Sequence, residues 1–184
     1  MIFDNKFTND VNNELNSSCK VTREAIKHVI DDPLFVPVFD MSIRKQKDLA
    51  LTRLQKVISK KLVSVKDFRT NPDNIFTMHE MLGFVDGSLA TKFTVQFNLF
   101  GGTLIALGTK KHESFLDKLD SLNVIGCFCL TELGYGNNAV EMETTATFDP
   151  IKKQFIINCP TIQSQKFWIT NGAYHANFAA VFAK

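Results

Sequence analysis

Apolar residues recur at every third or fourth position through the first two thirds of the chain, which is the spacing of one face of an α-helix. The clearest stripe lies in residues 49–62, beneath a lysine-rich outer face. Thr22 and Ser42 are suited to cap helices, and Pro72 is suited to the first turn of another. We expect this part of the chain to be helical, with a polar and loosely ordered start within residues 1–20.

Residues 89–107 are apolar on most sides, which predicts a buried central helix. Gly101 and Gly102 fall inside it, where each would cost about 1 kcal/mol if the helix were exposed. Close packing against a neighbour or a ligand would explain these glycines, and a simple kink would explain them equally well. A last short amphipathic helix is expected at residues 113–119.

The apolar pattern changes after Ser121 to a period of two, which is typical of β-strands. Asp149-Pro150 and Asn171-Gly172 are turn signals in this part of the chain. We expect strands at 124–130, 144–148, 155–157, 166–170 and 175–182. The predicted fold class is α+β, with an all-helical N-terminal domain at 1–122 followed by an antiparallel β-domain at 123–184. The last strand has no closing turn or partner, so we expect the sheet to be incomplete.

The composition fits a soluble globular protein, because 45% of the 184 residues are hydrophobic and 22% are charged. The formal net charge of +2 argues against a dedicated nucleic-acid binder, and the basic runs at 44–47 and 56–61 have spacings typical of the solvent-exposed face of a helix. No stretch approaches the roughly 20 apolar residues that a membrane span needs. The N-terminus has the features of neither a secretory signal nor a transit peptide. We therefore expect a soluble intracellular protein, cytoplasmic unless other features indicate a compartment.

The four cysteines are few and spread along the chain, which indicates a reduced compartment. Cys127 and Cys129 lie two apart on a predicted strand, so both should point to one face. No second cysteine or histidine pair has the spacing to complete a metal site with them. We interpret them as core thiols and predict no metal.

The segment 124–138 is the most informative for function, because an apolar run ends abruptly there in a polar loop with two glycines. Gly134 and Gly136 would let backbone N–H groups approach a bound molecule, and Thr131 would add a directional hydrogen bond. The pattern G-x-G-x-x-A that starts at Gly134 also fits dinucleotide-binding folds. Those folds require a helix directly afterwards, whereas residues 141–147 are rich in threonine and run into a turn, so we reject that interpretation.

A second constellation lies at 166–171, which reads K-F-W-I-T-N. Trp168 is the only tryptophan, and Thr170 should lie on the same face of the predicted strand. A flat aromatic ring beside a hydroxyl suits a planar heterocycle, whereas a core tryptophan that anchors the sheet is the alternative interpretation. If both segments serve one ligand, the loop 131–138 and the Trp168–Thr170 pair should converge on one flat cavity.

Taken together, these segments resemble a known family. The stretch V-I-G-C-F-C-L-T-E-L-G-Y-G-N-N-A-V-E-M-E-T-T-A-T-F-D is preceded by D-G-S-L-A-T-K-F-T-V-Q-F-N-L-F-G-G-T and followed by K-F-W-I-T-N. These motifs, from about residue 84 to 184, resemble acyl-CoA oxidases and, more distantly, acyl-CoA dehydrogenases. The resemblance implies an acyl-CoA dehydrogenase-like fold, in which FAD lies between a helical N-terminal domain, a middle β-domain and a C-terminal helical bundle. We expect no counterpart of the bundle within these 184 residues.

The resemblance implies FAD as the cofactor and assigns its contacts to Thr131, Gly134, Gly136, Asn137, Trp168, Thr170 and Asn171. In this assignment Thr131 contacts the pyrimidine end of the flavin, and the loop that follows faces the ribityl-pyrophosphate and the substrate thioester. Trp168 packs against the isoalloxazine ring, and Thr170 forms a hydrogen bond near its reactive edge. The helical face around residues 97–102 borders the fatty-acyl tunnel.

The family reaction removes the α-proton of a fatty acyl-CoA and passes the β-hydride to flavin, which gives a 2-trans-enoyl-CoA. Oxidases then pass the electrons to molecular oxygen and produce hydrogen peroxide. The resemblance also implies a homo-oligomer, most simply a dimer. It implies a peroxisomal location too, although residues 182–184 are not a Ser-Lys-Leu ending.

Three departures from the family pattern limit the expected activity. Asn137 stands where the family carries Ser or Thr, and residues 168–171 are closer to dehydrogenases than to the Gly-Gly pair of many oxidases. The family's general base is a glutamate of the C-terminal bundle, and neither Glu132 nor Glu141 is placed to replace it. We therefore assign no catalytic residue and expect a truncated oxidase-like flavoprotein with little activity alone. The alternatives are a non-catalytic module that binds acyl-CoA or a partner, and a dehydrogenase that uses an electron-transfer flavoprotein.

Overall fold

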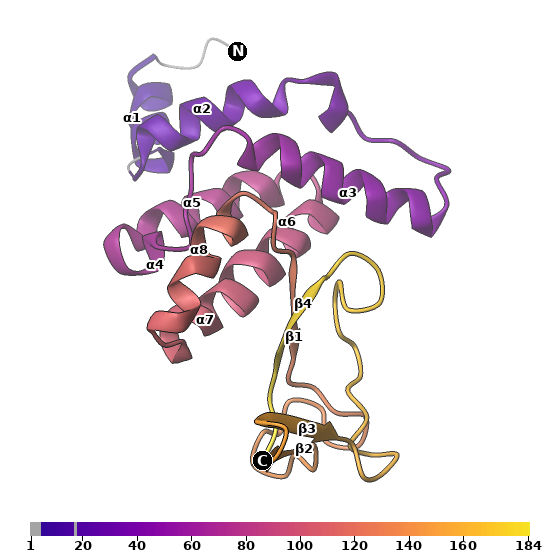
Figure 1. Ribbon diagram of the computed structural model, residues 1–184. Helices are drawn as coiled ribbons and strands as arrows, with labels where there is room; N and C mark the ends of the chain where they lie inside the picture. Colours follow the sequence, from indigo (N-terminus) through magenta and orange to yellow (C-terminus); the bar gives the residue numbers. More distant parts are fainter. Residues whose placement is uncertain (1–4, 17) are drawn as a thin grey trace.

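A computed structural model describes residues 5–16 and 18–184, and Figure 1 shows the helices gathered at one end and the strands leading away from them. The α-helices are α1 (Asn5–Leu15), α2 (Lys20–Ile30), α3 (Ile43–Ile58), α4 (Asp67–Thr70), α5 (Pro72–Gly83), α6 (Gly87–Phe93), α7 (Gly102–Leu107) and α8 (Glu113–Asp120). A π-helix, η2 (Thr94–Gly101), and two short 3₁₀ helices, η1 (Pro33–Phe35) and η3 (Lys110–His112), complete the helical part.

Two of the three predicted helix starts are confirmed. Ser42 caps α3 by accepting a hydrogen bond from the backbone N–H of Lys45, and Pro72 occupies the first turn of α5. The prediction that Thr22 caps a helix is wrong, because α2 already begins at Lys20. The hydroxyl of Thr22 instead donates to the side chain of Asn74 on α5, 2.8 Å away, and so ties two helices together.

The start of the chain differs in part from the expected loose order. Residues 5–15 form α1, which buries none of its side chains. The expected loose start at residues 1–4 lies outside the described residues. Phe7, Val11 and Leu15 recur at helical spacing along α1 and are all exposed, so this helix is not built into the core.

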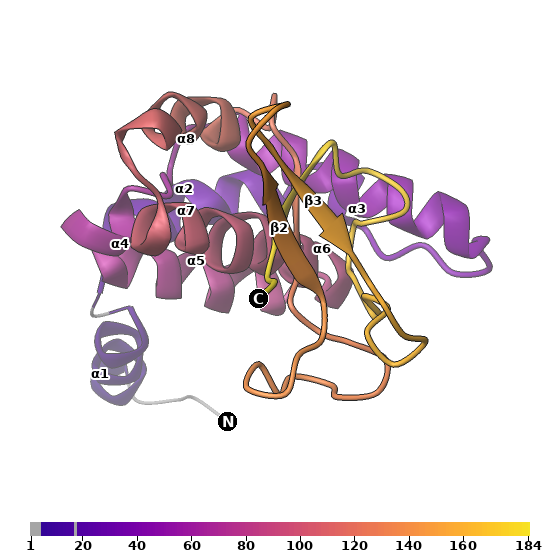
Figure 2. The same ribbon diagram turned by 60° about the horizontal axis from the view of Figure 1, so that its bottom comes forward.

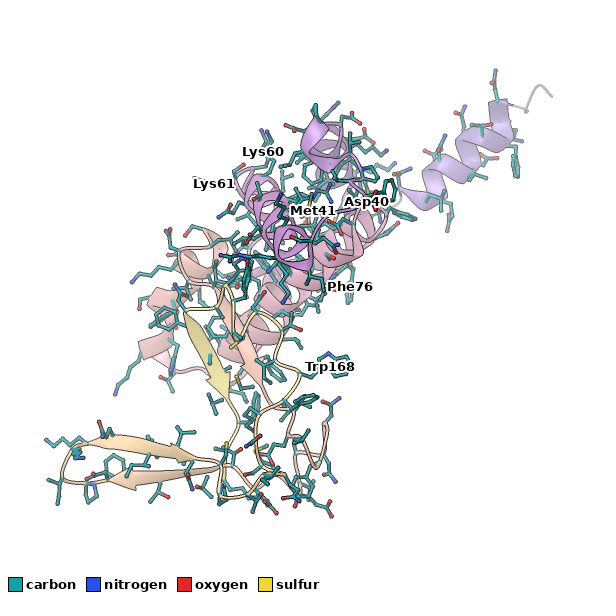
Figure 3. All side chains as sticks on the ribbon, turned by 90° about the vertical axis from the view of Figure 1, so that its right-hand side faces the viewer. Asp40, Met41, Lys60, Lys61, Phe76 and Trp168 are labelled. Atoms are coloured by element: carbon teal, nitrogen blue, oxygen red, sulfur yellow. The ribbon has the colours of Figure 1, made fainter. Side chains whose placement is uncertain are left out.

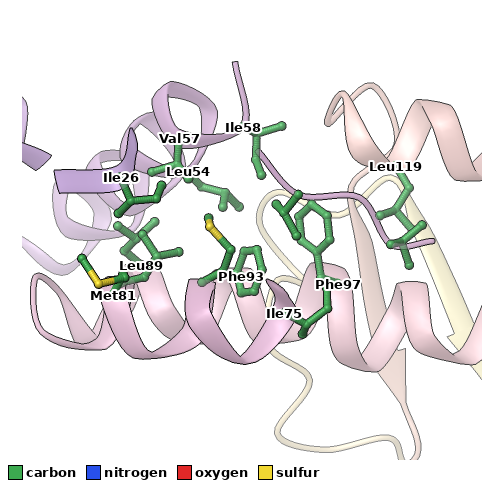
Figure 4. Packing of buried hydrophobic residues seen from close by; sticks show 14 of the residues in the cluster. Ile26, Leu54, Val57, Ile58, Ile75, Met81, Leu89, Phe93, Phe97 and Leu119 are labelled. Carbon is green, nitrogen blue, oxygen red and sulfur yellow. The ribbon is translucent and has the colours of Figure 1, made fainter. Parts of the chain in front are cut away.

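The predicted buried central helix is confirmed, because α6, η2 and α7 follow one another without interruption from Gly87 to Leu107. Figure 4 shows Phe93 and Phe97 of this helix packed among apolar side chains from α2, α3, α5 and α8. A Cβ at Gly101 would lie 2.6 Å from Cγ2 of Val65, whereas one at Gly102 would have no neighbour closer than 3.8 Å. Gly101 therefore marks close packing between segments, as one of the two interpretations predicted.

The strands are β1 (Gly126–Cys129), β2 (Thr145–Asp149), β3 (Gln154–Asn158) and β4 (Phe178–Val181). The strands β2 and β3 pair antiparallel as a hairpin, with Thr145 opposite Asn158. The strands β1 and β4 pair in parallel, with Gly126 opposite Phe178, so the expected antiparallel arrangement applies to the hairpin only. Figure 2 shows the hairpin standing in front of the helices as a separate ribbon.

The strand predicted at residues 166–170 is wrong. Lys166 forms an isolated bridge with Glu132, and the segment then leaves the extended conformation. Trp168 has φ 59° and Asn171 has φ 69°, which are left-handed values that interrupt a strand. This segment is an irregular loop, and its side chains do not alternate between two faces.

A buried glutamine of the central helix fixes where β1 lies. The side-chain amide of Gln96 donates to the carbonyl oxygens of Val124 and Leu119, at 2.7 and 3.2 Å. Its carbonyl oxygen accepts from the N–H of Gly126 at 3.0 Å. A Cβ at Gly126 would lie 2.0 Å from the ring of Phe100, so only glycine allows β1 to approach the helix this closely. The loop that follows β1 is therefore held at a fixed distance from the helical core.

Candidate functional site

The loop after β1 is organised around the buried side chain of Glu132, which is 1% exposed. Its carboxylate accepts hydrogen bonds from the backbone N–H groups of Glu143 and Thr144, at 2.9 and 3.0 Å, and from the hydroxyl of Thr144. The ammonium of Lys166 donates to the same carboxylate at 3.1 Å and to the carbonyl oxygen of Leu130 at 3.0 Å. Glu132 therefore joins three segments that are distant in the sequence.

The pKa of Glu132 shows that this carboxylate is a structural anion and not a base. Burial alone would raise the pKa, but the hydrogen bonds from Glu143, Thr144 and Lys166 outweigh burial and lower it to about 2. A carboxylate with so low a pKa, and with its oxygens already occupied by donors, is a poor proton acceptor. This agrees with the expectation that Glu132 does not replace a general base.

Two backbone N–H groups at the rim of this loop face no acceptor. The N–H groups of Thr131 and Asn137 have no hydrogen-bond partner within the part of the chain that the structure describes. The hydroxyl of Thr131 donates to the side-chain oxygen of Asn137 at 2.9 Å, which ties the two rims of the loop together. The rim therefore presents two donors that a bound carbonyl or phosphate oxygen could accept.

The two glycines of the loop have different roles. The N–H of Gly134 donates to the carbonyl oxygen of Gln163 at 2.9 Å, and a Cβ at Gly134 would lie 2.5 Å from the side chain of Gln163. Gly136 has φ 56°, with open space where a Cβ would project, and its N–H donates to the carbonyl oxygen of Glu132 at 2.8 Å. Gly134 allows close packing beneath the loop, and Gly136 allows the turn.

Trp168 lies beside this loop but not inside a cavity. The N–H of Phe167 donates to the carbonyl oxygen of Thr131 at 3.0 Å, so the two segments are neighbours along their backbones. The side chain of Trp168 is 83% exposed, and Figure 3 shows it projecting away from the ribbon. The core-anchor interpretation of this tryptophan is therefore wrong, and so is the expectation that Trp168 and Thr170 share one strand face.

Thr170 and Asn171 line a cleft of about 520 Å³ between the segment 169–175, the first half of α3 and the start of the central helix. None of the residues 131–138 lines this cleft, and Trp168 is outside it as well. The expected single flat cavity shared by the two segments is therefore not present within the described residues. The two segments instead form adjoining surfaces.

A second, more apolar cleft of about 630 Å³ lies between the central helix and β4. Phe100, Leu104 and Phe115 line its helical side, and Phe178 and Phe182 line the other side. Met142 and Ala139, which follow the glycine loop, close one end. Of the helical face predicted at 97–102, Phe100 lines this apolar cleft, and an acyl chain would require such a space.

Sequence reasoning missed the residues that hold these segments in place. The sequence pattern predicts Lys166 only as part of a strand and indicates no role for Lys92 or His175. The ammonium of Lys92 donates to the side-chain oxygen of Asn171 and to Nδ1 of His175, each at 2.8 Å. A lysine inside the most apolar helix of the chain was the available signal, because a buried ammonium requires polar partners.

The thiols of Cys127 and Cys129 lie 3.7 Å apart on one face of β1, as predicted, and burial raises the pKa of Cys129 to about 12. Within the described residues, no three or more His, Cys, Asp or Glu side chains gather where they could hold a metal ion. None of the described helices has the length and apolar character needed to cross a bilayer.

Comparisons with known proteins identify the relatives of this chain. It is 46% identical over 124 residues to peroxisomal acyl-coenzyme A oxidase 2 of Arabidopsis thaliana, a match that covers 65% of the chain. It is 35% identical over 156 residues to human peroxisomal acyl-coenzyme A oxidase 3, which covers 84% of the chain. The fold matches crystalline acyl-CoA oxidase 1 of Yarrowia lipolytica over 95% of the chain, with a TM-score of 0.79 and 28% identity.

A further match is acyl-CoA oxidase-2 of Caenorhabditis elegans, solved with FAD, ascaroside-CoA and ATP, at a TM-score of 0.63 and 25% identity. No family model matches the chain. The chain spans 18% and 22% of the length of the plant and human relatives, and 26% of the Yarrowia structure.

Proposed function

Because this chain belongs to the acyl-CoA oxidase family, we propose that it supplies part of the cofactor and substrate site of an FAD-dependent acyl-CoA oxidase. In this proposal residues 1–122 form the N-terminal helical domain, and residues 123–184 contribute to the middle β-domain. The substrate is a fatty acyl-CoA, the electron acceptor is molecular oxygen, and the compartment is the peroxisome, which the names of the plant and human relatives include.

The observation that carries this proposal is the pair of unpartnered N–H groups of Thr131 and Asn137 beside an exposed tryptophan. A flavin could bind both features, since the carbonyl oxygens of its pyrimidine edge can accept from the N–H groups and its flat aromatic ring can pack against the tryptophan. The residues present therefore fit the cofactor. Thr131 and Asn137 would hold the pyrimidine edge, Gly134 and Gly136 would let the loop approach the ribityl-pyrophosphate, and Trp168 would pack against the ring.

Bound FAD would supply the hydride acceptor for oxidation of the acyl thioester. The side chains of this chain would bind and orient the reactants. Thr170 and Asn171 would fix the edge of the ring, with Asn171 itself held by Lys92. The apolar cleft between Phe100 and Phe182 would take the acyl chain and exclude water from it. No carboxylate of the loop is free to remove the α-proton, because Glu132 is committed to structural hydrogen bonds.

The test is to add FAD to the purified 184-residue chain and follow quenching of Trp168 fluorescence together with flavin absorbance. We expect saturable quenching that Gly136→Val weakens at least about tenfold, because a β-branched residue is strained at positive φ and would fill the loop surface. Gly83→Val is the matched control, since a Cβ there also meets no neighbour and Gly83 lies at the end of α5, outside both clefts. Equal FAD binding by the wild type and Gly136→Val would contradict the placement of the cofactor on this loop.

Activity is tested by adding palmitoyl-CoA to the FAD-treated chain in air and measuring the hydrogen peroxide formed. We expect little or no peroxide from this chain alone, because none of its described carboxylates is both free and beside the proposed flavin surface. Efficient peroxide formation would show that a base is present in this chain, and would overturn our account of Glu132. Flavin reduction that proceeds without peroxide would instead favour a dehydrogenase that uses a protein electron acceptor.

A partner-binding module is the second candidate function, and the exposed hairpin favours it. Phe148, Phe155 and Ile157 of β2 and β3 are each at least 50% exposed, which is unusual for a two-stranded sheet facing only water. Size-exclusion chromatography with a full-length relative would test this function. Co-elution would support it, and independent elution of a monodisperse monomer would count against it.

A further inference from the structure

The cleft beside Asn171 contains the buried ammonium of Lys92, which forms no direct ion pair with a carboxylate among the described residues. The side chain of Lys92 is among the buried charged groups, at 7% exposure. Its two hydrogen-bond acceptors are the amide oxygen of Asn171 and Nδ1 of His175, and both are uncharged when they accept. Burying a charge without a counter-ion is costly, so this arrangement requires an explanation.

The two other buried basic side chains of the described residues, and the half-buried Lys166, each have such a counter-ion. Arg23 pairs with Glu80 at 2.6 Å, and Arg53 pairs with Asp86 at 2.7 Å. Lys166 pairs with Glu132 at 3.1 Å. Lys92 is therefore the one of these four basic side chains that lacks a direct carboxylate partner.

The acid nearest to Lys92 along this network is already engaged elsewhere. Asp48 of α3 accepts from Nε2 of His175 at 3.1 Å and from the hydroxyl of Tyr174 at 3.3 Å. His175 therefore carries its proton on Nε2 and offers the lone pair of Nδ1 to Lys92. An ammonium has three N–H donors, and these contacts use two of them.

The cleft has the features of a site for a negatively charged ligand. Lys47 of α3 lines it together with Lys92, and Gln46, Ser88, Thr91 and Thr170 add neutral hydrogen-bonding groups. No Asp or Glu is among its lining residues. Its volume of about 520 Å³ exceeds what an inorganic anion needs, and Ile43, Ala50, Ile169 and Tyr174 supply apolar or aromatic wall.

We propose that this cleft binds an organic phosphate, with Lys92 and Lys47 contacting the phosphate group and the apolar wall contacting the rest of the molecule. The cleft shares no residue with the loop 131–138, but it includes Thr170 and Asn171, which the proposed function places at the flavin edge. Failure of Gly136→Val to weaken FAD binding would therefore count against the flavin placement alone, and failure of Lys92→Met to weaken phosphate binding would count against this cleft alone. Burial lowers the pKa of Lys92 to about 8, and repulsion from Lys47 acts in the same direction, whereas attraction to Asp48 opposes both. A bound anion would raise that pKa further.

The chain carries its own reporter for this site, because its only tryptophan, Trp168, directly precedes the lining residues Ile169 and Thr170. The experiment titrates inorganic phosphate and phenyl phosphate at constant ionic strength while Trp168 fluorescence is recorded. We expect saturable changes with both probes and tighter binding of phenyl phosphate, because only it can also contact the apolar wall. Tighter binding of inorganic phosphate would contradict an organic ligand.

Variants separate this site from general charge effects. Lys92→Met should weaken binding by about tenfold or more, because a charged hydrogen bond to the phosphate is lost. Lys152→Met, in the exposed turn between β2 and β3, removes the same net charge at a distance and should leave binding unchanged. Because Lys92→Met could disturb packing, Lys47→Met is the second test. Lys47 is exposed, and its loss should weaken binding several-fold in a folded protein.

A direct measurement on Lys92 completes the test. In a sample labelled with ¹⁵N at lysine, the Nζ signal of Lys92 should titrate near pH 8 alone and at a higher pH with phenyl phosphate bound. Unsaturable titrations, equal binding by wild type and both lysine variants, or an unchanged Lys92 titration would each overturn the proposal. Phosphate would then be excluded as the counter-ion, which would have to be a protein carboxylate.

Discussion

The carboxylate of Glu132 accepts hydrogen bonds from two backbone N–H groups, a hydroxyl and an ammonium while it is almost completely buried. Removal of this charge would leave the half-buried ammonium of Lys166 without its counter-ion. A buried pair that loses one member is typically destabilised far more than the intact pair stabilises the fold. Glu132 is therefore the residue whose loss should most disturb the loop 131–138.

We expect Glu132→Gln to lower the free energy of unfolding by about 3 kcal/mol at pH 7, since one pKa unit corresponds to about 1.4 kcal/mol. Folding lowers the pKa of this carboxyl from its ordinary 4.5 to about 2. The stabilisation is therefore complete above pH 4.5 and is lost as the pH falls towards 2. Urea unfolding at pH 7 and pH 3 measures the difference, which should be smaller at pH 3.

The control is Glu141→Gln, because Glu141 is exposed and makes one side-chain contact, with Asn138. Its stability should remain within about 0.5 kcal/mol of the wild type at both pH values. A Glu132→Gln variant as stable as this control would show that the carboxylate does not hold the loop together.

At the scale of elements, the central helix depends on a close approach that one glycine permits. A Cβ at Gly101 would lie 2.6 Å from Cγ2 of the buried Val65 and 3.2 Å from Cδ1 of Leu119. We expect Gly101→Ala to destabilise the protein by about 1–3 kcal/mol, because overpacking displaces side chains that have no free space. Thermal or urea unfolding measures this change.

The neighbouring position supplies a matched control. Gly102→Ala places the same methyl group on the same helix, where its closest neighbour is 3.8 Å away. Alanine is the better helix former, so this variant should be more stable than the wild type by about 0.5–1 kcal/mol. Opposite signs for the two substitutions would support close packing at Gly101, and equal effects would argue for a general effect of helix propensity.

The sequence predicted the helices better than the strands, and particular residues explain why. A helix can be predicted from the spacing of apolar residues within its own segment, and Ser42 and Pro72 are local signals for where helices begin. Strand pairing depends on distant segments. The parallel partner of β1 lies beyond the whole hairpin, and no local pattern could reveal it. At 166–170 the left-handed backbone of Trp168 overrides a pattern that favours a strand.

The candidate site was predictable where it depends on glycine and family motif, and not where it depends on packing. The loop 131–138 and its neighbour Trp168 were found from sequence, and their backbones do adjoin. The prediction that the loop and Trp168–Thr170 share one cavity was wrong, because Trp168 is exposed and Thr170 lines a different cleft. The sequence assigned no role to Lys92 or His175 because their contacts join residues that are far apart in the sequence.

At the scale of the whole molecule, the exposed hairpin should govern association in solution. The rings of Phe148 and Phe155 contact each other across β2 and β3, with centroids 5.3 Å apart, and both remain more than half exposed. Apolar side chains on a short, uncovered sheet favour pairing with another chain. We expect concentration-dependent self-association that a Phe148→Thr, Phe155→Thr double variant reduces, as measured by analytical ultracentrifugation.

Phe76→Thr is the comparison for this experiment. Phe76 is 69% exposed on α5, away from the strands, so its replacement removes apolar surface without changing the hairpin. Association that falls equally in this variant would assign the effect to general hydrophobicity.

The parallel pairing of β1 with β4 also affects the order in which parts of the protein fold. Contacts between residues close in sequence form early during folding. The β1–β4 pair forms late, because the long intervening segment, with the glycine loop, the hairpin and the Trp168 segment, must first bring the two strands together. The helices can assemble without waiting for it. Both ligand surfaces are thus late products of folding, and a partly folded chain with a complete helical core would recognise neither ligand.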